Sequence, residues 1–359
     1  MGMLMKNELI KLFGRKSSWG MWIVLIISMF GMAFAIMKSN THSRQYYNDY
    51  DYKGGMTAYQ DENGNILSEN DFWYLTEDYD QYTETSLSLD ETVTFLENRL
   101  AQLNNDKKAD KELVKATKNQ LAFYQVYQEK GAQPADSREG TNSAQFFSIF
   151  GSLYVLPTLF SVIVASIIIA SEFSGGTIKL LLVRPFSRIQ ILMSKYIVTF
   201  VYSVITSVIM AVSAFAFSYL LPIQKLTLPV SEQTGAKTAI ELAAQLFASN
   251  LLLMVLYITI AFFFSAVIRS QALAVGVGMG ILFSGSFLGQ ILPNIIAKYD
   301  WLKWIIFNML GLNNQVMDAN YLAAGNLSIQ QTAIGIVAYI VIILIATLVL
   351  FKKRDVALT

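Results

Sequence analysis

The chain has 359 residues, of which 54% are hydrophobic and 15% are charged, and its formal net charge is +1. Soluble domains hold about 45–50% apolar and about 25% charged residues, so this composition excludes an ordinary soluble globular protein and indicates a membrane protein. Because the chain has no cysteine, disulfides, thiolate metal sites and cysteine nucleophiles are excluded as well.

Six apolar runs are long enough to cross about 30 Å of hydrocarbon, which takes about 20 helical residues. None contains a charged residue, and they cover residues 19–37, 146–170, 196–221, 242–268, 272–292 and 329–351. The first run is longer than the roughly 7–15 residues of a signal-peptide core, so we interpret it as a retained helix. We therefore predict an all-α integral membrane protein with six transmembrane helices, at 18–38, 146–170, 188–221, 241–268, 271–292 and 329–351.

Positive residues predict cytoplasmic termini, because Lys and Arg near helix ends tend to stay on the inner side of the membrane. They gather before the first span, in the stretch 171–195 and in the tail 352–359. Between residues 39 and 145 lie 19 of the 26 acidic residues and 10 Lys and Arg, which indicates a large acidic extracellular insertion. The pattern predicts a multi-pass protein of a bacterial plasma membrane, with outer segments at 39–145, 222–240 and 293–328.

The predicted extracellular insertion contains a helical hairpin. Apolar residues from Leu89 to Leu103 recur at steps of four and three, which is typical of a helix packed on a partner helix. A turn at 104–106 leads to a second helical pattern, 111–130, that stops at Gly131. The tyrosine-rich stretch before the hairpin, from 46 to 82, predicts irregular structure or short strands. A solvated acidic cap explains this insertion somewhat better than a dedicated substrate receptor does.

Several chemistries are disfavoured by what the spans lack. Ion-driven transporters keep ionisable groups inside the membrane, and the six apolar runs have none, although sodium binding by backbone carbonyls stays open. Intramembrane proteolysis is disfavoured because the single histidine, His42, lies in the outer insertion as a solvent-exposed bystander. The chain has no phosphate-binding loop, so another chain would have to hydrolyse any ATP that drives it.

The fifth span and the segment after it carry two further patterns. Gly276 with Gly280, and Gly285 with Gly289, have the spacing that lets helix backbones approach closely, which favours helix packing over a ligand role. In the segment 293–328, aromatic residues such as Trp301 predict an interfacial or re-entrant helix on the outer side.

The stretch 171–187, between the second and third spans, carries more charge than a plain loop needs. Gly175 and Gly176 predict a sharp reversal of the chain, which residues with a Cβ would resist. The apolar residues Ile178, Leu181 and Leu182 recur at helical spacing, with Lys179 opposite them, and Pro185 ends the pattern. This pattern predicts a short amphipathic helix, 178–182, at the cytoplasmic interface.

The third helix is predicted to begin at a capping box. Ser187 is followed three residues later by Gln190, and the helix that follows is long enough to project into the cytoplasm. Together with the crosswise helix before it, it would form a rigid handle for a soluble partner. In the alternative, Arg188 and Lys195 extend to lipid phosphates at a plain interfacial loop.

The N-terminal segment 1–17 predicts a cytoplasmic amphipathic helix. Met5, Leu9, Leu12 and Phe13 form an apolar stripe, and basic residues lie away from it. Two interfacial elements on the inner face favour a docking site there over a plain loop.

The stretch 172–196, EFSGGTIKLLLVRPFSRIQILMSKY, resembles the loop between the second and third helices of ABC transporter permeases of the type-2 class. The resemblance extends to the amphipathic N-terminal helix, the six spans, a short helix after the fifth span and the basic tail, but not to the outer insertion. It implies a homodimer or a pair of permeases bound to two copies of a separate ABC ATPase, which would hold the ATP and Mg. The implied residues for coupling to this ATPase are Glu172, Gly176, Thr177, Lys179, Arg184 and Arg188.

The resemblance also implies a transport pathway at the dimer interface, lined mainly by the second and fifth helices. Their low charge implies a hydrophobic or amphipathic cargo, and the acidic insertion favours a cationic membrane-active or antimicrobial peptide. This hypothesis needs no cofactor in the chain itself and no nucleic acid; membrane lipid is its surrounding partner. Export of drugs, lipids or sodium stays open, as does an immunity protein that senses an antimicrobial agent without transporting it.

Overall fold

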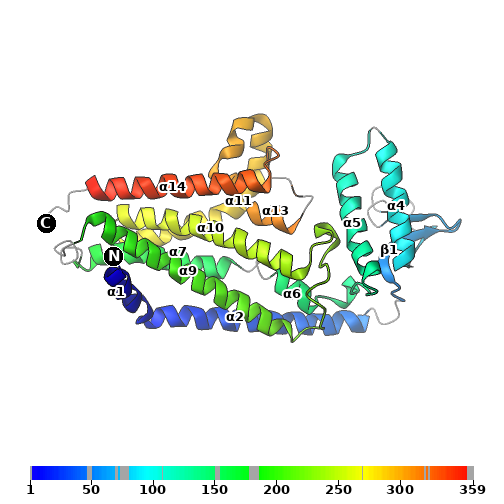
Figure 1. Ribbon diagram of the computed structural model, residues 1–359, viewed down its shortest axis with the longest axis horizontal. Helices are drawn as coiled ribbons and strands as arrows, with labels where there is room; N and C mark the ends of the chain where they lie inside the picture. The colour runs from blue at the N-terminus through cyan, green and yellow to red at the C-terminus, as the bar shows by residue number, and fades with distance from the viewer. Residues whose placement is uncertain are drawn as a thin grey trace.

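The computed structural model describes residues 2–46, 51–68, 72, 81–106, 108–149, 154–177, 186–268, 270–318, 321 and 324–353. Long helices run side by side along one axis, and a smaller domain of strands and helices caps one end (Figure 1). The first helix and the end of the last helix lie at the opposite end from this domain. The two predicted classes of structure, a helical bundle and an outer insertion, are therefore spatially separate.

Five of the described helices are long and apolar enough to cross a membrane, so the chain is a multi-pass membrane protein. The central helix, α10, packs against α7, α9, α11 and α14. The bundle helices are α2 (Lys16–Tyr46), α7 (Val155–Ser174), α9 (Arg188–Ser218), α10 (Ala239–Val267), α11 (Gln271–Lys298) and α14 (Ile329–Lys353). The predicted second span contains the end of α6 (Ser143–Ile149) and most of α7, and residues 150–153 lie outside the described residues.

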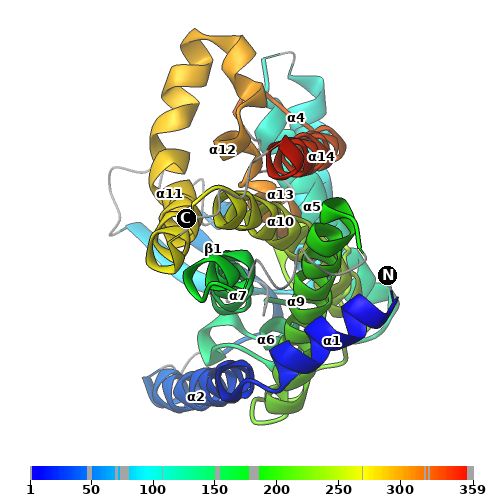
Figure 2. The ribbon, with the colours of Figure 1, turned by 90° about the vertical axis from the view of Figure 1, so that its left-hand side faces the viewer.

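Helix α11 does not end where the fifth apolar run ends. It continues through Pro293 to Lys298, whereas its apolar part with described side chains, Gln271–Ser284, is shorter than a span. Figure 2 shows its later part leaving the bundle and the chain returning through the short helices that follow. These are η5 (Asp300–Trp304), α12 (Ile306–Met309) and α13 (Leu312–Met317), which occupy the segment predicted to be re-entrant or interfacial.

The packing glycine on α11 differs from the predicted pair. A Cβ at Gly278 would lie 2.8 Å from the hydroxyl of Ser166 and 2.9 Å from Val162, both on α7. Gly276 and Gly280 meet nothing within 4 Å. The prediction of close packing at these two positions is wrong within the chain, because they face outward and Gly278 faces α7.

The capping boxes fix where two membrane helices begin. Ser187 accepts a hydrogen bond from the backbone N–H of Gln190 while the Gln190 side chain accepts one from Ser187 N–H, as predicted for α9. Thr238 and Glu241 form the same motif at the start of α10. Both boxes satisfy backbone donors that helix ends leave without intrahelical partners.

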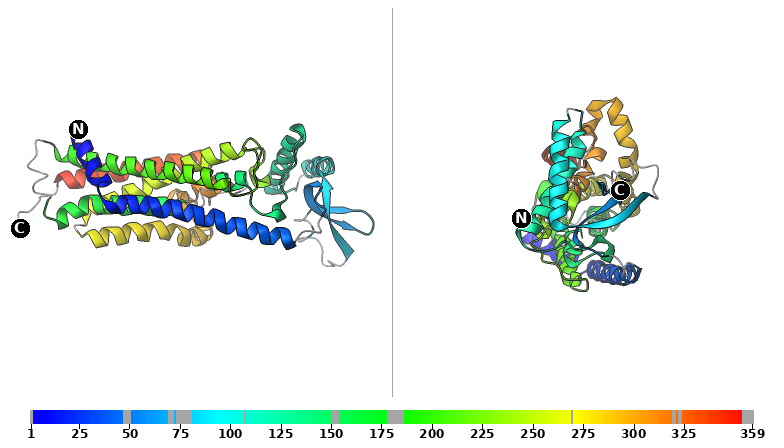
Figure 3. Two further views of the ribbon diagram at one scale, coloured as in Figure 1. Left: turned by 90° about the horizontal axis from the view of Figure 1, so that it is seen from below. Right: turned by 90° about the vertical axis from the view of Figure 1, so that its right-hand side faces the viewer.

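The outer domain combines the predicted helical hairpin with a small sheet (Figure 3). Its helices are α4 (Leu89–Asn105) and α5 (Lys111–Glu129), which confirms the hairpin. The strands are β1 (Gly54–Asp61), β2 (Ile66–Ser68) and β3 (Tyr82–Ser88), antiparallel in the order β2-β1-β3. The described chain is mostly helical, in keeping with the predicted helical membrane protein, and the tyrosine-rich stretch supplies two of these strands and the start of the third, as its pattern allowed.

Helix α2 links the bundle to this domain. It continues past the predicted end of the first span to Tyr46, since no Gly or Pro interrupts residues 38–46. The buried side chain of Asn40 donates to the carbonyl of Thr141, 2.7 Å away, and accepts from Thr141 N–H at 3.1 Å. Next to it, 3-10 helix η2 (Ser137–Glu139) also contacts α2. The outer domain is thus anchored on the end of α2.

Candidate functional site

The predicted coupling residues that the structure describes lie at the end of the bundle that holds the first helix, α1 (Gly2–Phe13). Glu172 occupies the last turn of α7, and Gly176 and Thr177 follow it directly. Arg188 is the first residue of α9. Lys179 and Arg184, and with them the predicted amphipathic helix 178–182, lie outside the described residues.

Four charged side chains meet beside these residues, and we call Glu8, Lys11, Glu172 and Lys195 the inner ion cluster. The Nζ atom of Lys195 lies 2.8 Å from Glu8 Oε2 and 3.1 Å from Glu172 Oε1. The Nζ atom of Lys11 lies 3.2 Å from the same Glu172 oxygen and 3.7 Å from Glu8 Oε1. The cluster joins α1, α7 and α9, and its two cations balance its two carboxylates.

Most of the inner ion cluster is buried. Lys195 is 2% exposed, Glu8 7% and Glu172 8%, whereas about half of the Lys11 side chain reaches solvent. Charges removed from water are retained only where close partners of opposite sign and hydrogen bonds compensate the lost hydration. Each buried member therefore depends on a partner from at least one other helix being in place.

The local sequence explains how each element presents its charge. On α1, Glu8 lies one turn from both Leu4 and Leu12, and all three are buried on one face. On α7, Glu172 is close to the C-terminus, where the helix dipole disfavours an anion, so the neighbouring lysines offset an unfavourable position. On α9, Lys195 follows the buried Leu192 by three residues and thus points into the bundle.

A tight turn holds the end of α7 in place. Gly176 has φ of +68°, a left-handed conformation that glycine adopts without strain. The turn brings the hydroxyl of Thr177 back onto the Glu172 carboxylate, to which it donates a hydrogen bond. Three of the predicted coupling residues, Glu172, Gly176 and Thr177, therefore form one connected unit.

Arg188 has a different neighbour. Its guanidinium donates to the backbone carbonyl of Lys352 at 3.5 Å, which links the start of α9 to the end of α14. Along the chain, Arg188 lies seven residues before Lys195 of the inner ion cluster. Of the predicted set, Arg188 thus belongs to a second contact at the same end of the bundle.

The structure corrects two features of the sequence interpretation. Lys195 does not extend to lipid phosphates, because its ammonium is enclosed between two carboxylates. Glu8 was missed, and the buried stripe of α1 runs through Leu4, Glu8 and Leu12. One signal was present in the sequence: Glu8 is the single acidic residue among the first 16, and it stands four residues from each of two leucines.

The chemistry available here is electrostatic and mechanical. Within the described ranges, no group of three or more His, Cys, Asp or Glu could hold a metal ion. The inner ion cluster itself consists of two carboxylates and two ammonium groups. What it can do is make three helices move together, or release them when its ion pairs break.

The chain is similar in sequence to two proteins of Bacillus subtilis (strain 168). It is 28% identical to the uncharacterized protein YhcI of Bacillus subtilis (strain 168), over 99% of both chains. It is also 26% identical to the uncharacterized membrane protein YdbK of the same organism, over 46% of this chain and 64% of YdbK. A family model described as protein of unknown function (DUF2705) matches residues 112–357. Since residues 112–357 make up well over half of this chain, the chain belongs to the DUF2705 family.

Proposed function

We propose that this chain is the membrane permease subunit of an ATP-driven exporter, coupled to a separate ABC ATPase that holds ATP and Mg. The observation that carries the proposal is the inner ion cluster, which ties the end of α7 to α1 and α9. A push on the segment between α7 and α9 would therefore move three helices as one body. Such a linkage is what a permease without its own phosphate-binding loop needs.

Pairing of two copies is part of this proposal. Helix α7 is largely covered by α9, α10 and α11, so α11 offers the more open face to a second permease. Gly276 and Gly280 on this face would let another helix approach closely. The large apolar side chain of Phe283 is 53% exposed on the same helix. In the plasma membrane, a homodimer or a pair of related permeases would cover this surface.

The cargo we propose is a hydrophobic or amphipathic molecule, with a cationic membrane-active peptide as the first candidate. The acidic outer domain supports a cationic cargo, because it attracts positive charge at the exit side. Apolar spans support a cargo that already partitions into lipid. Sodium, lipids and neutral drugs are the other classes of cargo for the proposed exporter.

Reconstitution tests the proposal. The chain and the ATPase that co-purifies with it are placed in lipid vesicles with a dansyl-labelled cationic amphipathic peptide. We expect peptide-stimulated ATP hydrolysis and ATP-dependent movement of the peptide. Glu172→Gln should reduce stimulation and movement roughly tenfold, equivalent to about 1.4 kcal/mol of coupling, while membrane insertion stays intact. The matched control is Glu241→Gln. It makes the same change in the capping box at the start of α10, at the opposite end of the bundle from Glu172.

Two outcomes would contradict the proposal. Peptide binding without ATP-dependent movement of any peptide, drug or lipid would favour a sensory or immunity protein. Accumulation of solute by the purified chain with an ion gradient alone would replace ATP-driven transport by ion-driven transport.

A further inference from the structure

A cavity of about 550 Å³ lies where the outer domain meets the bundle, and we call it the outer pocket. Its walls come from β1, α5, α6 and the 3-10 helix η4 (Glu232–Thr234), which lies between α9 and α10 in the chain. This volume is in the range of pockets that hold small organic molecules, about 300–1,000 Å³. The segments that build it are far apart in sequence, so it exists only in the folded chain.

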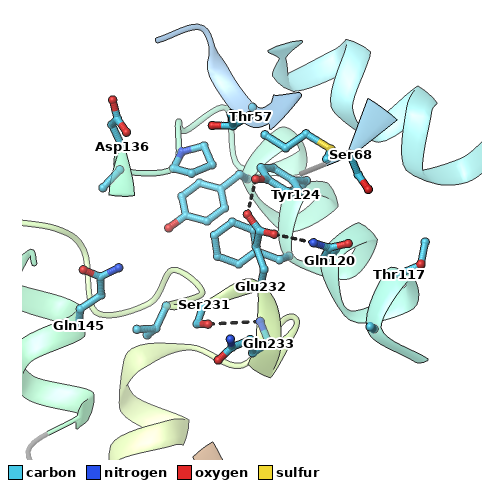
Figure 4. A pocket seen from close by; sticks show the side chains of 18 of the residues that line it. Thr57, Ser68, Thr117, Gln120, Tyr124, Asp136, Gln145, Ser231, Glu232 and Gln233 are labelled. Carbon is cyan, nitrogen blue, oxygen red and sulfur yellow. Dashed lines mark hydrogen bonds between the residues drawn. The ribbon is translucent and has the colours of Figure 1, made fainter. Parts of the chain in front are cut away.

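The carboxylate of Glu232 lies in the wall of the outer pocket between two neutral donors. Tyr124 donates its phenol hydrogen to Oε1 at 2.5 Å, and Gln120 donates from Nε2 to Oε2 at 2.9 Å (Figure 4). In the described part of the chain, no Lys or Arg lies within ion-pair distance of Glu232. Neutral donors orient the carboxylate and leave its charge without a counter-ion.

Aromatic side chains line the same pocket as this charge. Tyr52, Phe123, Tyr124 and Tyr127 all line the outer pocket, and Tyr124 and Tyr127 are almost fully buried. Burial, and after it the negative charge of Glu232, raises the pKa of Tyr124, which keeps its phenol protonated as a donor. Aromatic faces attract cations, and the attraction grows where water is excluded.

The other charged groups in the wall differ in how they are held. Asp136 is used locally, because its carboxylate accepts from the backbone N–H of Arg138 at 2.9 Å. Arg99 is the one cationic side chain among the described lining residues, and it donates to the hydroxyl of Ser68 at 3.0 Å. Against it stand three carboxylates, those of Asp136, Glu232 and Asp318, so the lining is net negative.

From this arrangement we infer that the outer pocket binds an organic cation, an ammonium or guanidinium group attached to an apolar or aromatic body. The charged group would pair with Glu232 and the body would lie against the rings of Tyr52, Phe123 and Tyr124. The lining amides of Gln120 and Gln145 supply hydrogen-bond partners for polar substituents. This site is independent of transport, because it needs neither ATP nor a second chain.

Calorimetry on the full chain in lipid nanodiscs tests the site with benzyltrimethylammonium as the probe and phenylacetate as an anion of similar size. We expect saturable binding of the cation and none of the anion. Glu232→Gln removes the charge and keeps one of the two acceptor oxygens that Tyr124 and Gln120 use, so the affinity for the cation should fall at least about tenfold. Glu62→Gln makes the same charge change at an exposed turn of the outer domain and should leave the affinity unchanged.

A second variant separates loss of binding from loss of fold. Ala116→Phe keeps every charge and fills the cavity from α5. It should therefore abolish binding while the melting temperature stays the same as that of the unaltered chain. Equal affinity in the unaltered chain and Glu232→Gln would overturn the inference, as would the absence of saturable binding. Preferential binding of phenylacetate would also overturn it, and would assign the outer pocket to anions held by Arg99.

Discussion

Two ion pairs in this chain have the same nitrogen–oxygen distance, but one is buried and the other is exposed to solvent. The Lys195–Glu8 pair and the Lys303–Asp300 pair each measure 2.8 Å from nitrogen to oxygen. The side chains of the first pair are 3% and 8% exposed, and those of the second are 26% and 73% exposed. We expect Lys195→Met to lower the free energy of unfolding by about 3–5 kcal/mol, because two buried carboxylates lose their cation. Lys303→Met should change it by about 0–1 kcal/mol.

Thermal unfolding followed by tryptophan fluorescence in detergent measures this difference. The double variant Glu8→Gln with Lys195→Met should recover part of the loss, because Glu172 then still pairs with Lys11. Equal melting temperatures for the Lys195 and Lys303 variants would show that the inner ion cluster contributes nothing that an exposed pair does not.

How much of this site could be predicted from the sequence depends on how far apart along the chain the interacting residues are. Glu172, Gly176 and Thr177 form a local unit within six residues, and the motif identified them together. The partners Glu8 and Lys195 are 187 positions apart, so their pairing follows from how α1 packs on α9. The predicted apolar stripe of α1 contains the buried Leu12, and its Leu9 and Phe13 pack against the same core, but the buried face also includes Leu4 and the charged Glu8, which an apolar pattern cannot indicate.

Among elements, the junction between α2 and the outer domain has one position without space for a side chain. Gly140 has φ of +94°, and a Cβ there would lie within 2.1 Å of the side-chain oxygen of Asn40. Gly131 also has positive φ, +56°, but meets nothing within 4 Å. We expect Gly131→Ala to lower the free energy of unfolding by about 1–2 kcal/mol from backbone strain alone. Gly140→Ala should lower it further, because the Asn40–Thr141 hydrogen bonds must also break.

Limited proteolysis and melting temperature together measure the effect. In Gly140→Ala the segment that follows η2, where it packs on the end of α2, should become a cleavage site. Gly131→Ala should keep the cleavage pattern of the unaltered chain. The same cleavage pattern in both variants would mean that Asn40 does not hold the outer domain on α2.

Elements with local signals were predicted better than those without. The hairpin and the start of α9 follow from apolar spacing and a capping box, and the structure has both. The sheet could not be placed, because β1 pairs with β3 across more than 20 residues and the intervening pattern shows no clear alternation. The first apolar run could not give the end of α2, because it reports the length of a span and the helix continues beyond that run to Tyr46.

At the scale of the whole molecule, the arrangement of the bundle makes a prediction about sidedness. The α4–α5 hairpin caps one end of the bundle, and the end of α14 lies at the other (Figures 1 and 3). If Lys and Arg orient the chain as in other membrane proteins, the hairpin faces outward and the end of α14 faces the cytoplasm. An odd number of crossings separates the hairpin from the C-terminal end in this arrangement.

Single cysteines can report this directly, because the chain has none of its own. Asp90→Cys on α4 and Lys353→Cys on α14 are both at exposed positions. A membrane-impermeant maleimide added to intact cells should label the Asp90 variant, and the Lys353 variant only after the cells are opened. Labelling of both from the same side would contradict the six-span topology. Labelling of Lys353 alone in intact cells would invert the chain and place the inner ion cluster on the side that no cytoplasmic ATPase can reach.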